Sequence, residues 1–378
     1  MRVAILRDSL PGETRVALLP DAVKALSSQG IEFAVEAGVG VHLGATDADY
    51  QAAGATIADR ESLLGGADVF PSINILSADD QGKLKRGAVI AGFLRPLDEP
   101  GTFLPAVQRG ATLFAMELIP RITRAQSMDA LSSMATVAGY KAVLIAADHL
   151  PRMFPLLMTA AGTVPPAKVF VLGAGVAGLQ AIATARRLGA VVEAYDVRAA
   201  AGEQVKSLGA KFLEVDLGGI ETEDKGGYAK ELSEEALNRG RDLIAKTCKT
   251  ADVVIATAQV PGKRSPLLVR RDAVENMKAG SVIVDLAAMN GGNCELTQPG
   301  KTIQHGEVTI FAPLNVAASI PVHASQLYSR NMMQFLKLLL AKGQLNLDMN
   351  DEIIKGACVA HNGEIVNPRV ASTLGAKA

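Results

Sequence analysis

Residues 168–198 of the chain read KVFVLGAGVAGLQAIATARRLGAVVEAYDVR. The run 169–172 is apolar and rich in β-branched residues, as expected of a buried parallel strand. A G-x-G-x-x-G pattern follows, made of Gly173, Gly175 and Gly178. Apolar residues at helical spacing come next, and a second apolar run, 191–195, leads to Asp196. Strand, glycines, helix, strand and acid in this order predict a Rossmann unit that binds a dinucleotide.

Each glycine of the pattern has a physical reason. Gly173 permits a tight turn, Gly175 lets a pyrophosphate approach bare backbone, and Gly178 lets the helix pack closely on the strand. The helix N-terminus then offers unpaired N–H groups and a partial positive charge to the phosphates. The alternative is a glycine-rich turn that binds no nucleotide. The correct order and spacing of strand, glycines, helix, second strand and acid argue against it.

The residues after the second strand bear on the choice of cofactor. Asp196 is placed to accept hydrogen bonds from an adenosine ribose and would repel a 2′-phosphate. Arg198 argues the other way, since an arginine at this place can bind that phosphate. We expect the acid to decide, which makes NAD(H) the cofactor rather than NADP(H).

Length and composition describe a folded chain of two domains. At 378 residues the chain is long for one core, and its 49% apolar and 20% charged content is that of a globular protein. A net charge of −1 gives no basis for binding nucleic acid or an anionic membrane. Cys248, Cys294 and Cys358 are scattered without C-x-x-C, so we expect no disulfide, no metal site and a reducing compartment. No stretch predicts a membrane span or a signal peptide.

Strands alternating with helices predict an α/β fold. We expect two Rossmann-like domains with parallel sheets: a discontinuous N-terminal domain, 1–130 plus 321–378, and an NAD(H)-binding domain, 131–320. Two long helical runs, 128–149 and 321–342, are expected to join the domains and leave a cleft between them, where ligands prefer to bind. Further strands are expected at 2–6, 33–35, 89–93, 112–116, 253–256, 282–285 and 308–311.

Four segments are candidates for the nicotinamide end of the site. Residues 120–133 read PRITRAQSMDALSS, in which arginine and aspartate can hold a carboxamide and glutamine can bridge to ribose or ring. The alternative for this segment is an ordinary helix N-terminus capped by Thr123 or Ser127. The other three segments are 222–230, with a glycine hinge and a tyrosine lid, 257–259 at the end of a strand, and the loop 285–294. For 222–230 a solvated connector, and for 285–294 a purely structural role, stay open.

General acid–base candidates are few. The five histidines are isolated from one another and from these segments: His42, His149, His305, His323 and His361. No H-E-x-x-H, G-x-S-x-G or metal-ligand cluster occurs in the sequence. A dehydrogenase acting on an alcohol or amine must move a proton as well as a hydride. Hydride transfer between two nicotinamide rings needs only that the rings be positioned, so the shortage of acid–base candidates favours this reaction.

Five segments resemble a known family. They are PRITRAQSMDALSS (120–133), AAGTVPPAKVFVLGAGVAGLQAIATARRLGA (160–190), GGYAKEL (226–232), TAQVPGK (257–263) and DLAAMNGGNC (285–294). The chain is similar, over essentially its whole length, to the NAD(H)-binding alpha subunit (domain I) of proton-translocating NAD(P)⁺ transhydrogenases. Alanine dehydrogenases are related to it and share the two-domain layout and the pattern PGETRVA at 11–17.

The resemblance implies the residues of the site. The loop that holds the nicotinamide and its ribose, and with it the catalytic role, corresponds to Arg121, Gln126, Asp129 and Ser132, with Ser127 and Met128 as further cofactor contacts. Adenosine and pyrophosphate are lined by the three glycines and by Val176, Asp196, Val197 and Arg198. A mobile loop that closes over the nucleotide corresponds to Gly227 and Tyr228, and a cleft wall to Thr257, Ala258 and Gln259.

The resemblance also implies partners. The family subunit forms a homodimer and docks onto an NADP(H)-binding domain carried by a membrane-embedded partner. Hydride passes from NADH to NADP⁺ in a Re/Si-specific reaction that is coupled to inward proton flow. We therefore expect a cytoplasmic subunit, peripheral to the inner face of the membrane through its partners. Because no membrane helices follow in the chain, the proton channel is expected to belong to separate polypeptides.

The chain departs from the related patterns at a few positions. Alanine dehydrogenases bind and activate their keto acid with a lysine and a histidine, and the corresponding segments, 68–76 and 91–99, contain neither. Met134 and Leu232 stand where relatives often have glutamine and methionine, which bears on packing and loop closure. An alanine-type dehydrogenase and a non-catalytic NAD-binding module are the alternatives to a transhydrogenase.

Overall fold

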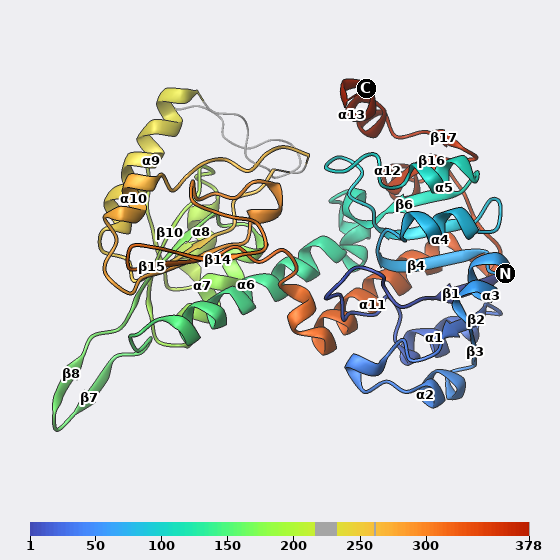
Figure 1. Cartoon of the computed structure of the whole chain (residues 1–378), viewed down its shortest axis with the longest axis horizontal. Coiled ribbons are helices and arrows are strands. Elements are labelled where there is room, and N and C mark those ends of the chain that lie inside the picture. Colours follow the sequence, from blue (N-terminus) through green and yellow to red (C-terminus); the bar gives the residue numbers. More distant parts are fainter. Residues whose placement is uncertain (216–232, 261, 378) are drawn as a thin grey trace. The chain divides into compact units, whose positions relative to one another are not determined.

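The computed structural model describes residues 1–215, 233–260 and 262–377 (Figure 1). It divides into two compact units: unit 1, made of Met1–Met134 and Ala317–Ala378, and unit 2, made of Ala135–Val316. Each unit has its own parallel-rich sheet and its own helices. The predicted α/β fold with two Rossmann-like sheets is therefore confirmed.

Unit 1 contains, within its described residues, an eight-stranded sheet of order β17-β16-β6-β5-β4-β1-β2-β3. The strands are β1 Arg2–Ile5, β2 Glu32–Glu36, β3 Ala55–Ala58, β4 Val69–Asn74, β5 Val89–Phe93, β6 Thr112–Ala115, β16 Cys358–His361 and β17 Glu364–Ile365. Strands β1 to β6 pair in parallel, whereas β16 and β17 are antiparallel additions at one edge. The order reverses between β1 and β4, the kind of place where open α/β sheets bind ligands.

Eight α-helices of the described chain belong to unit 1. They are α1 Pro20–Ser27, α2 Asp47–Ala52, α3 Arg60–Gly66, α4 Ala78–Lys83, α5 Leu104–Gln108, α11 Pro321–Leu339, α12 Glu352–Ala357 and α13 Pro368–Lys377. The buried hydroxyl of Ser325, on α11, accepts a hydrogen bond from the backbone N–H of Val16 at 3.0 Å, across 309 positions of sequence. Tyr328, also buried, donates to the Ser72 carbonyl at 2.7 Å. These contacts tie the C-terminal segment to the N-terminal strands.

Unit 2 contains, among its described residues, a seven-stranded sheet of order β11-β10-β9-β12-β13-β15-β14. The strands are β9 Lys168–Leu172, β10 Val191–Tyr195, β11 Lys211–Phe212, β12 Val253–Ala256, β13 Val282–Asp285, β14 Thr302–His305 and β15 Val308–Phe311. Its helices are α7 Val176–Arg187, α8 Ala201–Ser207, α9 Glu234–Cys248 and α10 Arg271–Glu275. All neighbouring strands are parallel except β14 and β15. The order reverses between β9 and β12, next to the glycine-rich turn.

Helix α6, Ala130–His149, begins in unit 1 and continues into unit 2, whereas α11 lies wholly in unit 1. In the portion of the chain that the structure describes, α6 alone is long and apolar enough to cross a membrane by length and composition. It carries Lys141 and Asp148, and its residues Ala142, Val143 and Ala146 are buried in the core of unit 2. Core packing therefore accounts for part of the apolar character of α6.

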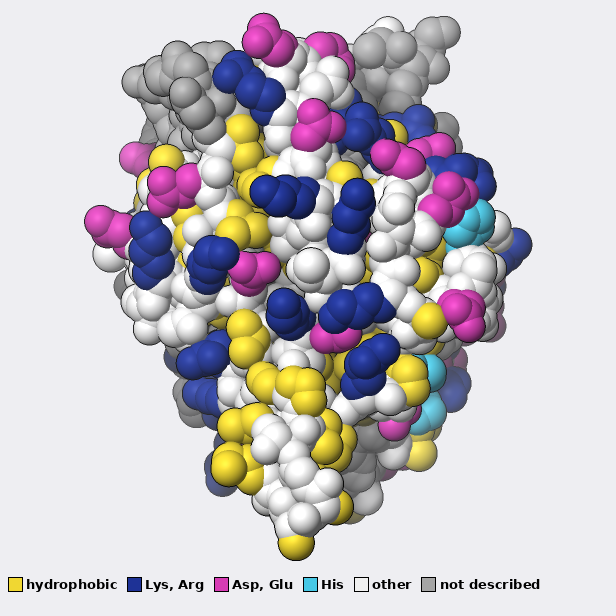
Figure 2. Space-filling model, turned by 90° about the vertical axis from the view of Figure 1, so that its left-hand side faces the viewer, with side chains coloured by type: hydrophobic (Ala, Val, Ile, Leu, Met, Phe, Trp, Pro, Cys, Tyr) yellow, Lys and Arg dark blue, Asp and Glu magenta, His cyan; other side chains and the backbone are white. Residues whose placement is uncertain are grey.

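A hairpin that the sequence pattern did not indicate belongs to unit 2. Strand β7, Leu157–Thr159, pairs in antiparallel fashion with β8, Gly162–Val164, and every residue of both strands is exposed. Met158 is 74% exposed. Figure 2 shows apolar side chains gathered at the lower end of the drawn face, where this hairpin lies. The hairpin thus presents apolar surface that its own unit does not cover.

The three cysteines are free and buried, Cys248 and Cys294 in unit 2 and Cys358 in unit 1. Burial raises the pKa of the Cys248 thiol to about 12. Burial likewise raises the pKa of Cys294 and of Cys358 to about 11. All three side chains are therefore neutral packing groups at physiological pH.

We predict that Gly139→Ala destabilises unit 2. A Cβ on Gly139, in α6, would lie 2.1 Å from the carbonyl oxygen of Ala177, in α7, so the helix backbones would have to separate. The expected loss is about 1–3 kcal/mol in the free energy of unfolding, seen as a lower Tm by calorimetry. Gly65→Ala, in α3, is the matched control, because a Cβ there meets nothing within 4 Å. That variant should be unchanged or up to about 1 kcal/mol more stable, and equal Tm shifts for both variants would contradict the prediction.

Candidate functional site

The glycine-rich turn after β9 has the form that a diphosphate requires. Gly173 has a φ of +90°, which favours glycine. A Cβ on Gly178 would lie 1.8 Å from the Gly173 carbonyl oxygen, so only glycine allows α7 to begin this close to the turn. Among the described residues, a Cβ on Gly175 would meet nothing within 4 Å and no side chain caps the N-terminus of α7. Open backbone beside an uncapped helix end fits a bound phosphate group.

Thr257 follows β12 and supports this turn from the neighbouring strand. Its hydroxyl lies 3.1 Å from the carbonyl oxygens of both Leu172 and Gly173, to which it can donate. The predicted wall residue thus contacts the glycine turn itself. The hydrogen bond holds the end of β9 against the end of β12, at the reversal of strand order.

The loop after β13 is organised by a buried carboxylate. Asp285 accepts hydrogen bonds from the Asn293 backbone N–H at 2.7 Å and from the Thr297 hydroxyl at 2.6 Å. Burial raises the pKa of Asp285, and these hydrogen bonds oppose the rise. The Asn293 side chain in turn brackets Ala258, accepting from its N–H at 3.0 Å and donating to its carbonyl at 2.9 Å. This loop therefore positions the segment that contains Ala258 and Gln259, a role of Asn293 that sequence reasoning missed.

Asp196, just after β10, is fully engaged by hydrogen-bond donors. Its Oδ2 accepts from the Ala174 backbone N–H at 2.7 Å and from Nη2 of Arg198 at 2.8 Å. Its Oδ1 accepts from the backbone N–H and from Nε of Arg198, at 2.8 and 2.9 Å. The carboxylate therefore joins the glycine turn to the arginine, and the two residues that argued for different cofactors form an ion pair with each other.

The predicted nicotinamide loop contains a short 3-10 helix, Thr123–Met128, followed directly by α6. Oδ1 of Asp129 accepts from the Ser132 backbone N–H at 2.8 Å, and its Oδ2 accepts from the Ser132 hydroxyl at 2.6 Å. This is the contact of a helix N-cap. The suggestion that Thr123 or Ser127 caps the helix is wrong, because Asp129 does.

Backbone contacts and the ion pair of Arg124 help to hold the rest of this loop in unit 1. The Ser127 carbonyl accepts from the Asn331 side chain, on α11, at 2.9 Å. Arg124, the second arginine of this segment, pairs with Asp351 at 2.7 Å. Arg121, Gln126 and Ser127 are exposed, whereas Met128 is buried. The loop thus presents polar side chains on a backbone that its own unit fixes.

The predicted site residues fall into two groups. Unit 1 holds Arg121, Gln126, Ser127, Met128, Asp129 and Ser132. Unit 2 holds Gly173, Gly175, Val176, Gly178, Asp196, Val197, Arg198, Thr257, Ala258 and Gln259. In unit 2 hydrogen bonds bring Asp196, Arg198 and Thr257 to the glycine turn, Val176 is exposed, and Val197 is partly packed in the core. Gly227, Tyr228 and Leu232 lie outside the described residues.

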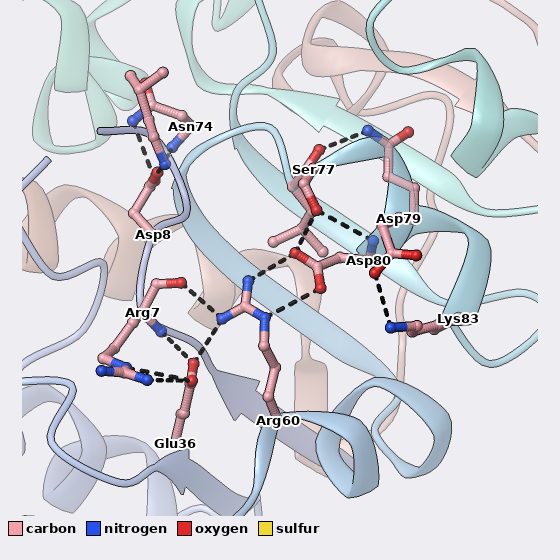
Figure 3. A network of polar contacts seen from close by, with 12 residues as sticks. Arg7, Asp8, Glu36, Arg60, Asn74, Ser77, Asp79, Asp80 and Lys83 are labelled. Carbon is pink, nitrogen blue, oxygen red and sulfur yellow. Dashed lines mark hydrogen bonds and ion pairs between the residues drawn. The ribbon is translucent and has the colours of Figure 1, made fainter. Parts of the chain in front are cut away.

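A charged network that was not anticipated lies in unit 1 (Figure 3). The Arg60 guanidinium joins two buried carboxylates, with Nη1 2.7 Å from Oε2 of Glu36 and Nη2 2.7 Å from Oδ2 of Asp80. Asp8 accepts from the Asn74 side chain at 3.1 Å. Asn74 is the last residue of β4 and Asp8 follows β1, so the network sits where the strand order reverses. The sequence offered one signal for this network, namely that polar residues such as Asp8 follow predicted strands. Within the described residues no group of three or more metal-ligand side chains could hold a metal ion.

Glu117 follows β6 and its carboxyl group is buried. Burial raises its pKa to about 7, against hydrogen bonds from backbone N–H groups. Its Oε1 accepts from the Arg95 backbone N–H at 2.5 Å, whereas Oε2 has no hydrogen-bond partner among the described residues. A carboxyl group that keeps its proton near neutral pH satisfies this environment best.

Comparison with known proteins gives matches along nearly the whole chain. Residues 4–138 match the N-terminal domain, and residues 142–368 the C-terminal domain, of the alanine dehydrogenase/PNT family. The first part of NAD(P) transhydrogenase subunit alpha from Rhodospirillum rubrum is 46% identical over 377 residues, covering 97% of this chain and 98% of that protein.

Solved structures agree with these matches. The crystal structure of transhydrogenase from Sinorhizobium meliloti has a TM-score of 0.85 and 43% identity, covering 97% of this chain and 99% of that one. An L-alanine dehydrogenase structure has a TM-score of 0.83 and 23% identity over 100% of both chains, which shows the shared fold.

We predict a pH signature for Glu117. Its pKa of about 7 lies above the ordinary value of 4.5, so the folded state holds an extra proton between these values. The stability that Glu117 contributes is fully present below pH 4.5 and is lost as pH rises through about 7. Glu117→Gln has no such proton to lose, so its unfolding free energy should rise relative to the parent chain by about 1–3 kcal/mol between pH 5 and pH 8. Urea unfolding at both pH values measures this, and a pH-independent difference would contradict it.

Proposed function

Because the chain belongs to the alanine dehydrogenase/PNT family, we propose that it is the NAD(H)-binding alpha subunit of a proton-translocating NAD(P) transhydrogenase. Bound NADH supplies a hydride from C4 of its nicotinamide, and an NADP⁺ on a partner domain accepts it. The observation that carries the proposal is the open backbone at Gly175 beside the uncapped N-terminus of α7, in register with Asp196.

The residues of this chain bind NADH and orient its nicotinamide ring. The backbone of the glycine turn and the start of α7 hold the pyrophosphate, because their N–H groups suit an anion. Asp196 takes the adenosine ribose, with Val176, Val197 and Arg198 lining that end and Thr257, Ala258 and Gln259 forming a wall. Nicotinamide and its ribose are held by Arg121, Gln126, Ser127, Met128, Asp129 and Ser132, and the loop of Gly227 and Tyr228 closes over the nucleotide.

The lack of a lysine and a histidine for proton transfer supports transhydrogenation rather than oxidation of an amino acid. The segments that would carry the keto-acid ligands form the region of β4 and β5, and they supply Asn74 and Arg95 rather than lysine and histidine. Transfer between two nicotinamide rings leaves no proton to be moved, so a missing acid–base pair is no handicap.

We extend the proposal to the partners. The exposed apolar hairpin β7–β8 supports a homodimer, because isolated two-stranded hairpins need a packing partner. The subunit docks onto an NADP(H)-binding domain and reaches membrane-embedded proton-channel subunits through it, in a Re/Si-specific enzyme. This places the chain in the cytoplasm, peripheral to the membrane. The two compact units serve as the two domains of the subunit.

The proposal predicts hydride exchange in a reconstituted pair. Mixing the purified chain with a purified NADP(H)-binding domain should transfer hydride from NADH to an oxidised NADP analogue, followed by absorbance. The chain alone, given pyruvate and ammonia, should not oxidise NADH. Oxidation under those conditions would point to an alanine-type dehydrogenase, and NADH binding without any turnover to a non-catalytic module. Either result overturns the proposal.

Asp129 variants should separate ring orientation from helix capping. Asp129→Asn keeps a side chain that caps helices well, so stability should change by less than about 0.5 kcal/mol. It loses the carboxylate, so we predict that hydride transfer falls about tenfold or more while NADH affinity changes little. Asp129→Ala should show the same kinetic loss plus about 1 kcal/mol of instability from the lost cap. Equal losses of rate and affinity in Asp129→Asn would argue against the ring-orienting role.

A further inference from the structure

Asp196 has no spare hydrogen-bonding capacity in the folded chain. A carboxylate offers about four lone-pair sites, two on each oxygen. Four donors occupy them at 2.7 to 2.9 Å: the Ala174 N–H and the N–H, Nε and Nη2 of Arg198. The side chains are also well covered, with 7% of Asp196 and 18% of Arg198 exposed. A ribose diol can therefore reach this carboxylate only if a donor leaves.

The four donors differ in how easily they can leave. The Ala174 N–H belongs to the glycine turn, which Thr257 and the start of α7 hold in place. The Arg198 N–H lies two residues from the carboxylate along the backbone. The guanidinium is on a long side chain with several rotatable bonds, so it can turn away from the carboxylate without any movement of the backbone. The guanidinium is the donor that can be exchanged.

Resting on the proposed binding of NAD(H) at Asp196, we propose that Arg198 is a specificity-determining residue that competes with the adenosine ribose for that carboxylate. In the nucleotide-free chain the guanidinium occupies the ribose position. When NADH binds, the two ribose hydroxyls replace it as donors and the guanidinium turns away. Part of the binding free energy is spent on this exchange, so the chain binds NADH more weakly than its carboxylate would allow.

Arg198 also acts on the choice between the two dinucleotides. Once released, its guanidinium can pair with a 2′-phosphate, and it offsets the charge of Asp196 that repels this phosphate. Arg198 therefore lowers the affinity for NADH and weakens the discrimination against NADPH at the same time. A residue that merely supports the fold would do neither.

The test is titration of the full chain with NADH and NADPH, followed by nucleotide fluorescence. Arg198→Met should bind NADH about three- to tenfold more tightly and should bind NADPH no more tightly. Arg198→Lys should show a smaller gain, because an ammonium makes only a point contact with a carboxylate. The matched control is Lys211→Met, which removes one positive charge from β11, where Lys211 pairs with Glu193 at 2.9 Å, and leaves Asp196 untouched. Its NADH affinity should equal that of the parent chain.

A second probe isolates the ribose hydroxyls. With NADH that carries 2′-deoxyribose on the adenosine, the gain of Arg198→Met should shrink to less than about twofold, because one competing donor is missing. Unchanged or weaker NADH binding by Arg198→Met, with a parent-like Tm, overturns the competition and makes Arg198 an ordinary contact. A parent chain that binds neither dinucleotide overturns the proposed function as well, so the two failures are distinguishable.

Discussion

The approach of helix α7 to the turn after β9, with no room for a side chain at Gly178, is the constraint on which unit 2 depends. Three other segments of the unit secure the same turn. Thr257 reaches it from β12, Asp196 accepts the Ala174 N–H from the end of β10, and Gly139 brings α6 against the first turn of α7. The backbone that would receive an anion is therefore fixed before any ligand arrives, which limits the ordering entropy lost on binding.

Buried carboxylates at the ends of parallel strands recur in both units, and their donors decide what each one does. Glu36, at the end of β2, accepts hydrogen bonds from the side chains of Arg7 and Arg60. Asp285, at the end of β13, accepts them from backbone N–H groups of its loop. Asp196 has backbone donors too, but half of its hydrogen bonds come from one flexible side chain. Fixed donors make a carboxylate structural, whereas an exchangeable donor leaves it open to a ligand.

Much of the fold and some of the site follow from local sequence. The strands 191–195, 253–256, 282–285 and 308–311 have the predicted bounds, because apolar β-branched runs favour strands. Strands 253–256 and 282–285 are also buried along their whole length, as expected in the middle of a parallel sheet. The hairpin β7–β8 was missed because it is short and exposed and therefore carries no burial pattern. Other contacts of the site could not be predicted, because they join residues that are far apart in the sequence. Examples are the two hydrogen bonds between Asn293 and Ala258 and the ion pair between Arg124 and Asp351.

The buried cysteines have a consequence for the chemical modification of the chain. A thiol reacts as its thiolate, and burial keeps all three thiols protonated and covered. The three thiols should therefore not react with peroxide or with alkylating reagents while the chain is folded. Since Cys358 belongs to one unit and Cys248 and Cys294 to the other, modification of a given thiol would reveal which unit had opened.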